Sequence, residues 1–113
     1  MPDSKHVLFV CSQNRLRSPT AQHVFAEWPD VDTYSAGLGA DAEVPLSAHQ
    51  IDWADIIFVM EEKQRRGLAL KFRRHLAGKP VVCLDIPDQY GYMQPELVSL
   101  LQSRAGPFLR QAT

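Results

Sequence analysis

The chain has 113 residues, of which 45% are apolar and 22% are charged, and its formal net charge is −1. A chain of this length can bury one modest core without metal or disulfide support, so we expect residues 1–113 to form a single domain. The near-zero charge gives no general attraction to nucleic acid or to a membrane surface. Two cysteines, Cys11 and Cys83, are too few for a disulfide framework. Together with the absence of a signal peptide or a bilayer-length apolar segment, they indicate a soluble, cytoplasmic protein.

The first predicted element is a strand over residues 6–10, because this run is short and continuously apolar. Ser18 then offers an N-cap and Pro19 a first helical position. Apolar residues at helical spacing over 21–28 predict a helix that ends near Pro29. Residues 32–35 form a weaker strand candidate.

The middle of the chain begins with a predicted loop over residues 36–46, rich in glycine and acidic residues. Ser47 and Gln50 have the spacing of a capping box before a short helical turn that ends at Ala54. The sequence DIIFVM over residues 55–60 predicts a second buried strand.

Acidic residues at 61 and 62 open the next predicted helix, which Gly78 and Pro80 terminate. Its inner face consists of leucine and phenylalanine residues, and its second half is basic. Residues 81–84 predict a third buried strand, residues 85–94 a loop, and Pro95 the start of a last helix.

Alternation of apolar strands with helices predicts an α/β fold with a parallel sheet and helices on both faces. Ligands in such folds bind at the carboxyl ends of the strands. Cys11 lies at the carboxyl end of the first strand, whereas Asp85 and Asp88 follow the last one. We therefore expect a functional site at this edge of the sheet.

The segment CSQNRLRSPT over residues 11–20 has the pattern Cys-x5-Arg between a strand and a helix start. Backbone N–H groups of such a loop can surround an anion at a helix N-terminus. The Arg17 guanidinium can add two charge-assisted hydrogen bonds to a phosphoryl group. The same donors stabilise a thiolate, and a Cys11 thiolate beneath a bound phosphate is a nucleophile placed for attack.

These residues resemble the signature of the low-molecular-weight protein tyrosine phosphatase family, Cys-x-Gly-Asn-x-Cys-Arg-Ser-Pro. The SAG sequence at 35–37 and the segment ADIIFVMEEKQRRGL also resemble family segments, and IPDQYG at 86–91 resembles its Asp-Pro-Tyr acid loop. The positions that match the cysteine loop are Cys11, Asn14, Arg17, Ser18 and Pro19.

The resemblance implies a three-layer α/β/α fold with a four-stranded parallel sheet in the order 2-1-3-4. It also implies a phosphatase that needs no metal or cofactor and acts through a cysteinyl-phosphate. Cys11 would be the nucleophile, Arg17 the oxyanion ligand and Asp88 the general acid. Asp85, which is closer to the strand end, is the alternative acid. The implied phosphate-binding residues are Ser12, Gln13, Asn14, Arg15, Leu16, Arg17 and Ser18.

Departures from the family pattern concern specificity and redox behaviour. Gln13 replaces the loop glycine, and Leu16 replaces a second loop cysteine that could protect the nucleophile as a disulfide. The substrate wall between residues 37 and 55 is short, and Tyr90 and Tyr92 could replace part of it. The implied partner is a phosphotyrosine protein or a small aryl phosphate. Arg15 would suit a substrate that carries a second anionic group.

Three alternatives remain at this point. An arsenate reductase on the same fold would need further thiols, and only Cys83, inside a strand, is present. A non-catalytic phosphate-binding module would use the same loop without turnover. The basic segment 63–79 could bind nucleic acid or an acidic partner, but such a segment is more often a solvent-exposed helix face. The four histidines do not have the spacing of metal ligands, either with one another or with the cysteines. The sequence does not indicate an oligomeric state.

Overall fold

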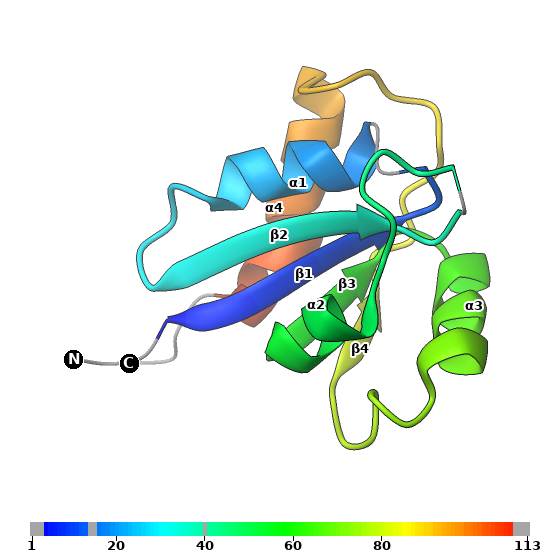
Figure 1. Ribbon diagram of the computed structural model, residues 1–113. Coiled ribbons are helices and arrows are strands. Elements are labelled where there is room, and N and C mark those ends of the chain that lie inside the picture. Colours follow the sequence, from blue (N-terminus) through cyan, green and yellow to red (C-terminus); the bar gives the residue numbers. More distant parts are fainter. Residues whose placement is uncertain (1–3, 14–15, 40, 110–113) are drawn as a thin grey trace.

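The computed structural model describes residues 4–13, 16–39 and 41–109 (Figure 1). Strands and helices alternate along the chain, as the sequence predicts. The elements in chain order are β1 (Lys5–Cys11), α1 (Arg17–Phe25), β2 (Val31–Gly37), α2 (Ala48–Trp53), β3 (Ile56–Val59), α3 (Glu62–Phe72), β4 (Val81–Cys83) and α4 (Pro95–Leu109).

The four strands form one parallel sheet in the order β2-β1-β3-β4, which confirms the predicted fold class. β1 lies in the interior of the sheet and pairs with β2 along its whole length, from Lys5 opposite Val31 to Cys11 opposite Gly37. The helices cover both faces, with α1 and α4 on one side and α2 and α3 on the other (Figure 1). Within the described ranges, every helix is too short or too polar to traverse a bilayer.

Side chains of the central strands alternate between two hydrophobic cores, one on each face. Phe9 of β1 and Phe58 of β3 belong to the core under α1 and α4, and their rings stack at a centroid distance of 5.4 Å. Leu8 and Ile57 point the other way, into the core under α2 and α3. Both faces are buried from Val7 to Cys11 of β1 and throughout β3, so these stretches are apolar at every position instead of at every second one.

The start of α1 differs from the prediction. The helix begins at Arg17 with Leu16 as its N-cap, so Ser18 and Pro19 lie inside the first turn. The predicted Ser18 N-cap is therefore wrong. The Ser18 hydroxyl instead contacts the Cys11 sulfur at 2.9 Å, and this serine serves the cysteine loop and not the helix end.

Two helices end earlier than predicted: α1 ends at Phe25 and not near Pro29, and α3 ends at Phe72, with turns up to Gly78. The start of α2 agrees with the prediction. Gln50 Oε1 accepts a hydrogen bond from the Ser47 N–H at 2.8 Å, which confirms the predicted capping interaction. β2 is longer than the weak pattern suggested. The hydroxyls of its Thr33 and Ser35 both donate to Gln22 of α1, so these polar residues have partners within the fold.

The carboxyl ends of β1, β3 and β4 are level with one another, which brings distant segments together. Val10 lies opposite Val59, and Val59 lies opposite Cys83. Beyond β4 the chain continues alongside β3, since the Ile86 N–H donates to the Met60 carbonyl at 2.8 Å. The loop after β1, the start of α3 and the segment after β4 therefore meet at one edge.

Candidate active site

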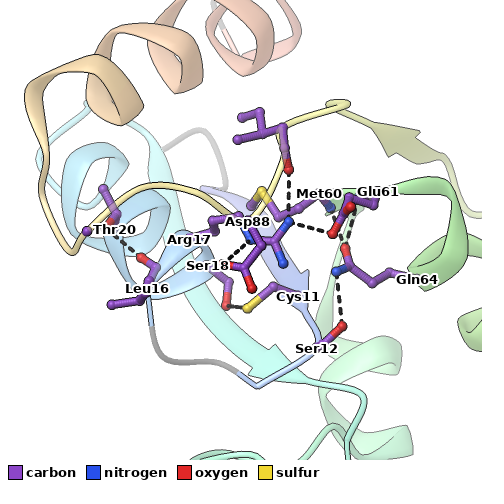
Figure 2. A network of polar contacts seen from close by, with 12 residues as sticks. Cys11, Ser12, Leu16, Arg17, Ser18, Thr20, Met60, Glu61, Gln64 and Asp88 are labelled. Atoms are coloured by element: carbon purple, nitrogen blue, oxygen red, sulfur yellow. Dashed lines mark hydrogen bonds and ion pairs between the residues drawn. The ribbon is translucent and has the colours of Figure 1, made fainter.

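Cys11 ends β1 with its side chain on the face covered by α1 and α4. Its residue surface is only 3% exposed. The Sγ atom lies 2.9 Å from Ser18 Oγ, and this hydrogen bond connects the sulfur to the first turn of α1 (Figure 2). A hydroxyl that donates to sulfur stabilises a thiolate, and the helix N-terminus adds a positive dipole end.

Arg17, the first residue of α1, is held in place by two acceptors from other segments. Its Nη1 donates to Glu61 Oε1 at 2.7 Å and to the Ile86 carbonyl at 2.8 Å, and its side chain is 4% exposed. Because these two bonds use both N–H groups of Nη1, the Nε and Nη2 groups remain for a ligand. These two nitrogens form the edge of the guanidinium that can bind two oxygens of one phosphoryl group.

Asp88 reaches the same site from the segment after β4. Its Oδ1 lies 3.7 Å from Arg17 Nε, and its side chain is 65% exposed, so it stands at the mouth of the site (Figure 2). Asp85 is not among the residues that line the pocket. It adopts a left-handed backbone conformation with φ of 59°, and its carbonyl accepts a hydrogen bond from Arg104 at 2.6 Å. Of the two candidate acids, Asp88 is the one beside Cys11 and Arg17.

The loop after Cys11 is fastened to the segment after β2. The Leu38 N–H donates to the Cys11 carbonyl at 3.0 Å, and the Gly39 N–H donates to the Ser12 carbonyl at 2.8 Å. A Cβ atom built on Gly39 would lie 3.1 Å from that Ser12 oxygen, so the glycine permits the close approach. These bonds turn the Cys11 and Ser12 carbonyls away from the site, which favours N–H groups pointing into it.

Gln64 connects the cysteine loop to the start of α3. Its Oε1 accepts hydrogen bonds from the N–H groups of Met60 and Glu61 at 2.8 and 2.9 Å. Its Nε2 donates to Ser12 Oγ at 3.3 Å, and the residue is 1% exposed (Figure 2). A buried amide with all these partners fixes the distance between the loop and the helix that carries Glu61.

A pocket with a volume of about 120 Å³ opens between these segments. Its described lining consists of the following residues: Cys11, Ser12, Gln13, Leu16, Arg17 and Asp88. The loop residues Asn14 and Arg15, also predicted at this site, lie outside the described residues. Ser18 lies beneath the pocket, in contact with the sulfur.

The two predicted wall tyrosines lie outside this lining. Tyr90 packs against the core under α1 and α4. Tyr92 is exposed, and its ring meets His23 of α1 edge-on at 6.4 Å.

Two residues at the site were missed by sequence reasoning, Glu61 and Gln64. In the sequence they resemble an ordinary acidic helix start followed three residues later by a capping glutamine. Their position after β3, the neighbour of β1, was the available signal. Among the described residues, no cluster of histidine, cysteine or acidic side chains could hold a metal ion.

Cys83 lies in β4 and is partly buried against the core under α2 and α3. Burial raises the pKa of its thiol, the neighbouring Glu62 adds to this rise, and a backbone hydrogen bond at Asp85 opposes it. A thiol with a raised pKa is mostly protonated at neutral pH, so Cys83 is the less nucleophilic type of cysteine.

Comparison with solved structures shows the same fold in several phosphatases. YwlE arginine phosphatase from Geobacillus stearothermophilus superposes with a TM-score of 0.74 at 22% identity, covering 92% of each chain. Vibrio vulnificus Wzb in complex with benzylphosphonate gives a TM-score of 0.76 at 21% identity, covering 93% of this chain and 97% of that one. The tyrosine phosphatase Wzb from Escherichia coli K30, in complex with phosphate, gives 0.75 at 18% identity, covering 94% and 96%.

These neighbours have the low-molecular-weight phosphatase fold, which confirms the fold that the sequence resemblance implied. No protein-family model matches the chain. No curated protein matches it by sequence either. The fold is thus established by structure.

Proposed function

We propose that the protein is a cysteine-dependent phosphomonoester hydrolase that acts through a cysteinyl-phosphate. One observation supports this above all: Cys11, Arg17 and Asp88 come from two distant segments of the chain and line the same pocket. Their roles as nucleophile, oxyanion ligand and general acid need this proximity. The fold neighbours described as phosphatases support the same reaction class.

In the first step, the Cys11 thiolate attacks phosphorus and forms a sulfur–phosphorus bond while the phosphorus–oxygen bond to the leaving group breaks. Arg17 Nε and Nη2 bind equatorial oxygens, together with N–H groups of the loop that starts at Ser12. Asp88 gives its proton to the leaving oxygen.

In the second step, water attacks the cysteinyl-phosphate, and Asp88 takes the water's proton. The sulfur–phosphorus bond breaks, which returns the electron pair to the Cys11 sulfur as a thiolate. The Ser18 hydroxyl, 2.9 Å away, stabilises this leaving sulfur. Inorganic phosphate then departs through the exposed mouth beside Asp88.

Phosphotyrosine proteins or small aryl phosphates are the proposed substrates. Leu16 lines the pocket and is partly exposed, so it offers an apolar contact to a ring. One fold neighbour is described as a tyrosine phosphatase and another as an arginine phosphatase, so phosphoarginine is the comparison substrate. Arsenate reduction is not favoured, since the described neighbours are phosphatases. Neither described cysteine is in a disulfide, and we place the protein in the cytoplasm, where thiols stay reduced.

The test compares hydrolysis of para-nitrophenyl phosphate and phenyl phosphate by the wild type and three variants. Cys11→Ser should abolish turnover. Asp88→Asn should lower kcat by about 10²-fold or more with phenyl phosphate, and less with the nitrophenyl ester, because nitrophenolate leaves without protonation more readily. Asp85→Asn, the matched control, should keep most of the activity.

Two results would contradict the proposal. Tight phosphate binding by the wild type without any hydrolysis would identify a non-catalytic binding module. Full activity of Asp88→Asn together with loss in Asp85→Asn would reverse the assignment of the acid. A phosphoarginine peptide turned over faster than a phosphotyrosine peptide would change the substrate to a phosphoramidate. A phosphorus–nitrogen bond would then break and Asp88 would protonate the leaving nitrogen, while the cysteinyl-phosphate would still form.

A further inference from the structure

The segment that carries Asp88 is bounded by two residues with a left-handed backbone conformation. Asp85 and Met93 each have a φ of 59°. This conformation is uncommon for residues other than glycine, and it persists only where neighbouring contacts hold it. We call residues 85–93 the Asp88 loop. Its shape therefore depends on the contacts made at its two ends.

Each end of the Asp88 loop is hydrogen-bonded to a different helix. At the first end, Arg104 Nη1 of α4 donates to the Asp85 carbonyl at 2.6 Å. At the second end, the Met93 N–H donates to Thr20 Oγ1 of α1 at 3.0 Å. Asp88 lies between these anchors, three residues after the first and five before the second. The two hydrogen bonds thus restrict the positions that its carboxyl can take.

Thr20 is also bonded to the end of the cysteine loop. Its hydroxyl donates to the Leu16 carbonyl at 2.6 Å (Figure 2). A hydroxyl has one proton, so this bond leaves the oxygen as an acceptor, which is the role that the Met93 N–H requires. Leu16 lines the pocket and directly precedes Arg17. One threonine oxygen therefore joins the Asp88 loop to the loop that carries the candidate nucleophile.

The position of the Asp88 carboxyl depends on the backbone that carries it. Its side chain is 65% exposed, and its Oδ1 lies 3.7 Å from Arg17 Nε. Within residues 4–13, 16–39 and 41–109, this is the only polar contact of the side chain, and it is too long for a hydrogen bond. Thr20 is fully buried and outside the described pocket lining, so it can act on the carboxyl only through the loop.

We propose that Thr20 is a positioning residue for Asp88. Its hydroxyl holds the second end of the Asp88 loop against the cysteine loop and so keeps the carboxyl at the mouth of the pocket. This inference rests on the proposed phosphatase function and adds the residue that sets the geometry of proton transfer to the leaving group. Loss of the hydroxyl should shift the carboxyl without releasing the whole loop, because Arg104 still holds the first end and Tyr90 packs against the core.

The test measures kcat/KM of Thr20→Val, which has nearly the same shape as the wild type but no hydroxyl. With phenyl phosphate we expect a fall of about three- to tenfold, the range for loss of one neutral hydrogen bond. With para-nitrophenyl phosphate the fall should be less than about twofold, because nitrophenolate leaves without protonation more readily. Thr20→Ser keeps the hydroxyl and should retain most of the activity with both esters.

Thr33→Val is the matched control for Thr20→Val. The Thr33 hydroxyl also donates to a backbone carbonyl of α1, that of Gln22 at 3.0 Å, but Thr33 lies in β2 and outside the described pocket lining. Its loss should leave kcat/KM for both esters unchanged. Thr20→Ala compared with Thr20→Ser isolates the same hydroxyl a second time, so the comparison can be made even where the valine variant does not fold.

A second measurement separates positioning of Asp88 from general support of the fold. In the Asp88→Asn background the acid is already absent, so adding Thr20→Val should cause no further loss with phenyl phosphate. The inhibition constant of inorganic phosphate should change by less than about twofold in Thr20→Val, because both partners of Arg17 Nη1 are retained. A purely structural role would lower activity with both esters alike and would add to the effect of Asp88→Asn.

Three results would overturn the inference: equal losses with the two esters, an unreduced loss from Thr20→Val in the Asp88→Asn background, or a serine variant as impaired as the alanine variant. The wild-type assay with para-nitrophenyl phosphate separates this inference from the proposed function. Absence of hydrolysis by the wild type would overturn the proposed function itself. Normal wild-type hydrolysis, with Thr20→Val as active as Thr33→Val on phenyl phosphate, would overturn the role of Thr20 alone.

Discussion

Arg17 and Glu61 are joined by a hydrogen bond of 2.7 Å between Nη1 and Oε1, with the arginine side chain almost fully buried. Glu61 follows β3 and Arg17 begins α1, so this ion pair connects the two crossovers that flank the candidate active site. The carboxylate orients the guanidinium so that its other edge faces the pocket.

Removal of the Glu61 carboxylate should therefore impair catalysis through Arg17. We expect Glu61→Ala to lower kcat/KM for para-nitrophenyl phosphate by about 10- to 100-fold, the range for loss of a charge-assisted hydrogen bond. Glu61→Gln retains an acceptor oxygen and should lose less. Glu62→Ala is the matched control, because Glu62 is exposed and pairs with Arg65. Equal effects of Glu61→Ala and Glu62→Ala would show that the ion pair does not position Arg17.

The close contact between Gly39 and the Ser12 carbonyl gives a second prediction. A methyl group at residue 39 would meet that oxygen at 3.1 Å, so Gly39→Ala should displace the cysteine loop. We expect the inhibition constant of inorganic phosphate to rise about three- to tenfold, since the loop N–H groups then align poorly with the anion. Gly91→Ala places its methyl at an ordinary 3.7 Å from Gln94 and should leave phosphate binding unchanged. A phosphate affinity of Gly39→Ala equal to that of the wild type would argue against a preorganised loop.

The fold could be predicted because its strands are buried on both faces. The mainly apolar runs at 6–10 and 55–60 are shorter than a typical buried helix, and their length is typical of buried parallel strands. They also alternate with predicted helices. The ends of elements could not be predicted to the residue. Ser18 resembles an N-cap in sequence, yet α1 begins one residue earlier, at Arg17.

The site was predictable where residue spacing alone brings groups together, as for Cys11 and Arg17. The site could not be predicted where contacts between distant segments determine which residues lie in it. Two aspartates follow β4, and only the tertiary structure shows that Asp88 lies 3.7 Å from Arg17 and lines the pocket, whereas Asp85 does not line it. The strand order implied by the resemblance places β3 next to β1, but the sequence does not show that the Glu61 carboxylate reaches Arg17.

Oxidation should distinguish this protein from relatives with a second cysteine in the loop. Leu16 lines the pocket beside Cys11, so a Cys11 sulfenic acid meets a leucine there and not a thiol. Cys83 is a weak substitute because burial raises its pKa. After a brief peroxide treatment, we expect dithiothreitol to restore only part of the wild-type activity, with sulfinic acid on Cys11 by mass spectrometry. Leu16→Cys should recover most of its activity through a disulfide. Complete recovery of the wild type would mean that another protective reaction operates.

Lys79 supports the fold on the far side of the sheet, away from the candidate active site. Its Nζ donates to the carbonyls of Ile51 and Ala54, each at 2.7 Å, and so closes the C-terminal end of α2. Loss of this ammonium would leave carbonyl groups without their charged donor. We expect Lys79→Met to lower the free energy of unfolding by about 1.5–3 kcal/mol, measured by urea denaturation.

Lys71→Met provides the matched control for Lys79→Met. Lys71 makes one exposed contact of 3.3 Å to the Leu38 carbonyl, so its loss should cost less than about 0.5 kcal/mol. The para-nitrophenyl phosphate activity of the folded Lys79→Met protein should remain at the wild-type level, because α2 contributes no residue to the described pocket lining. Equal stability of the two variants would show that the carbonyls of α2 are satisfied by water once the lysine is removed.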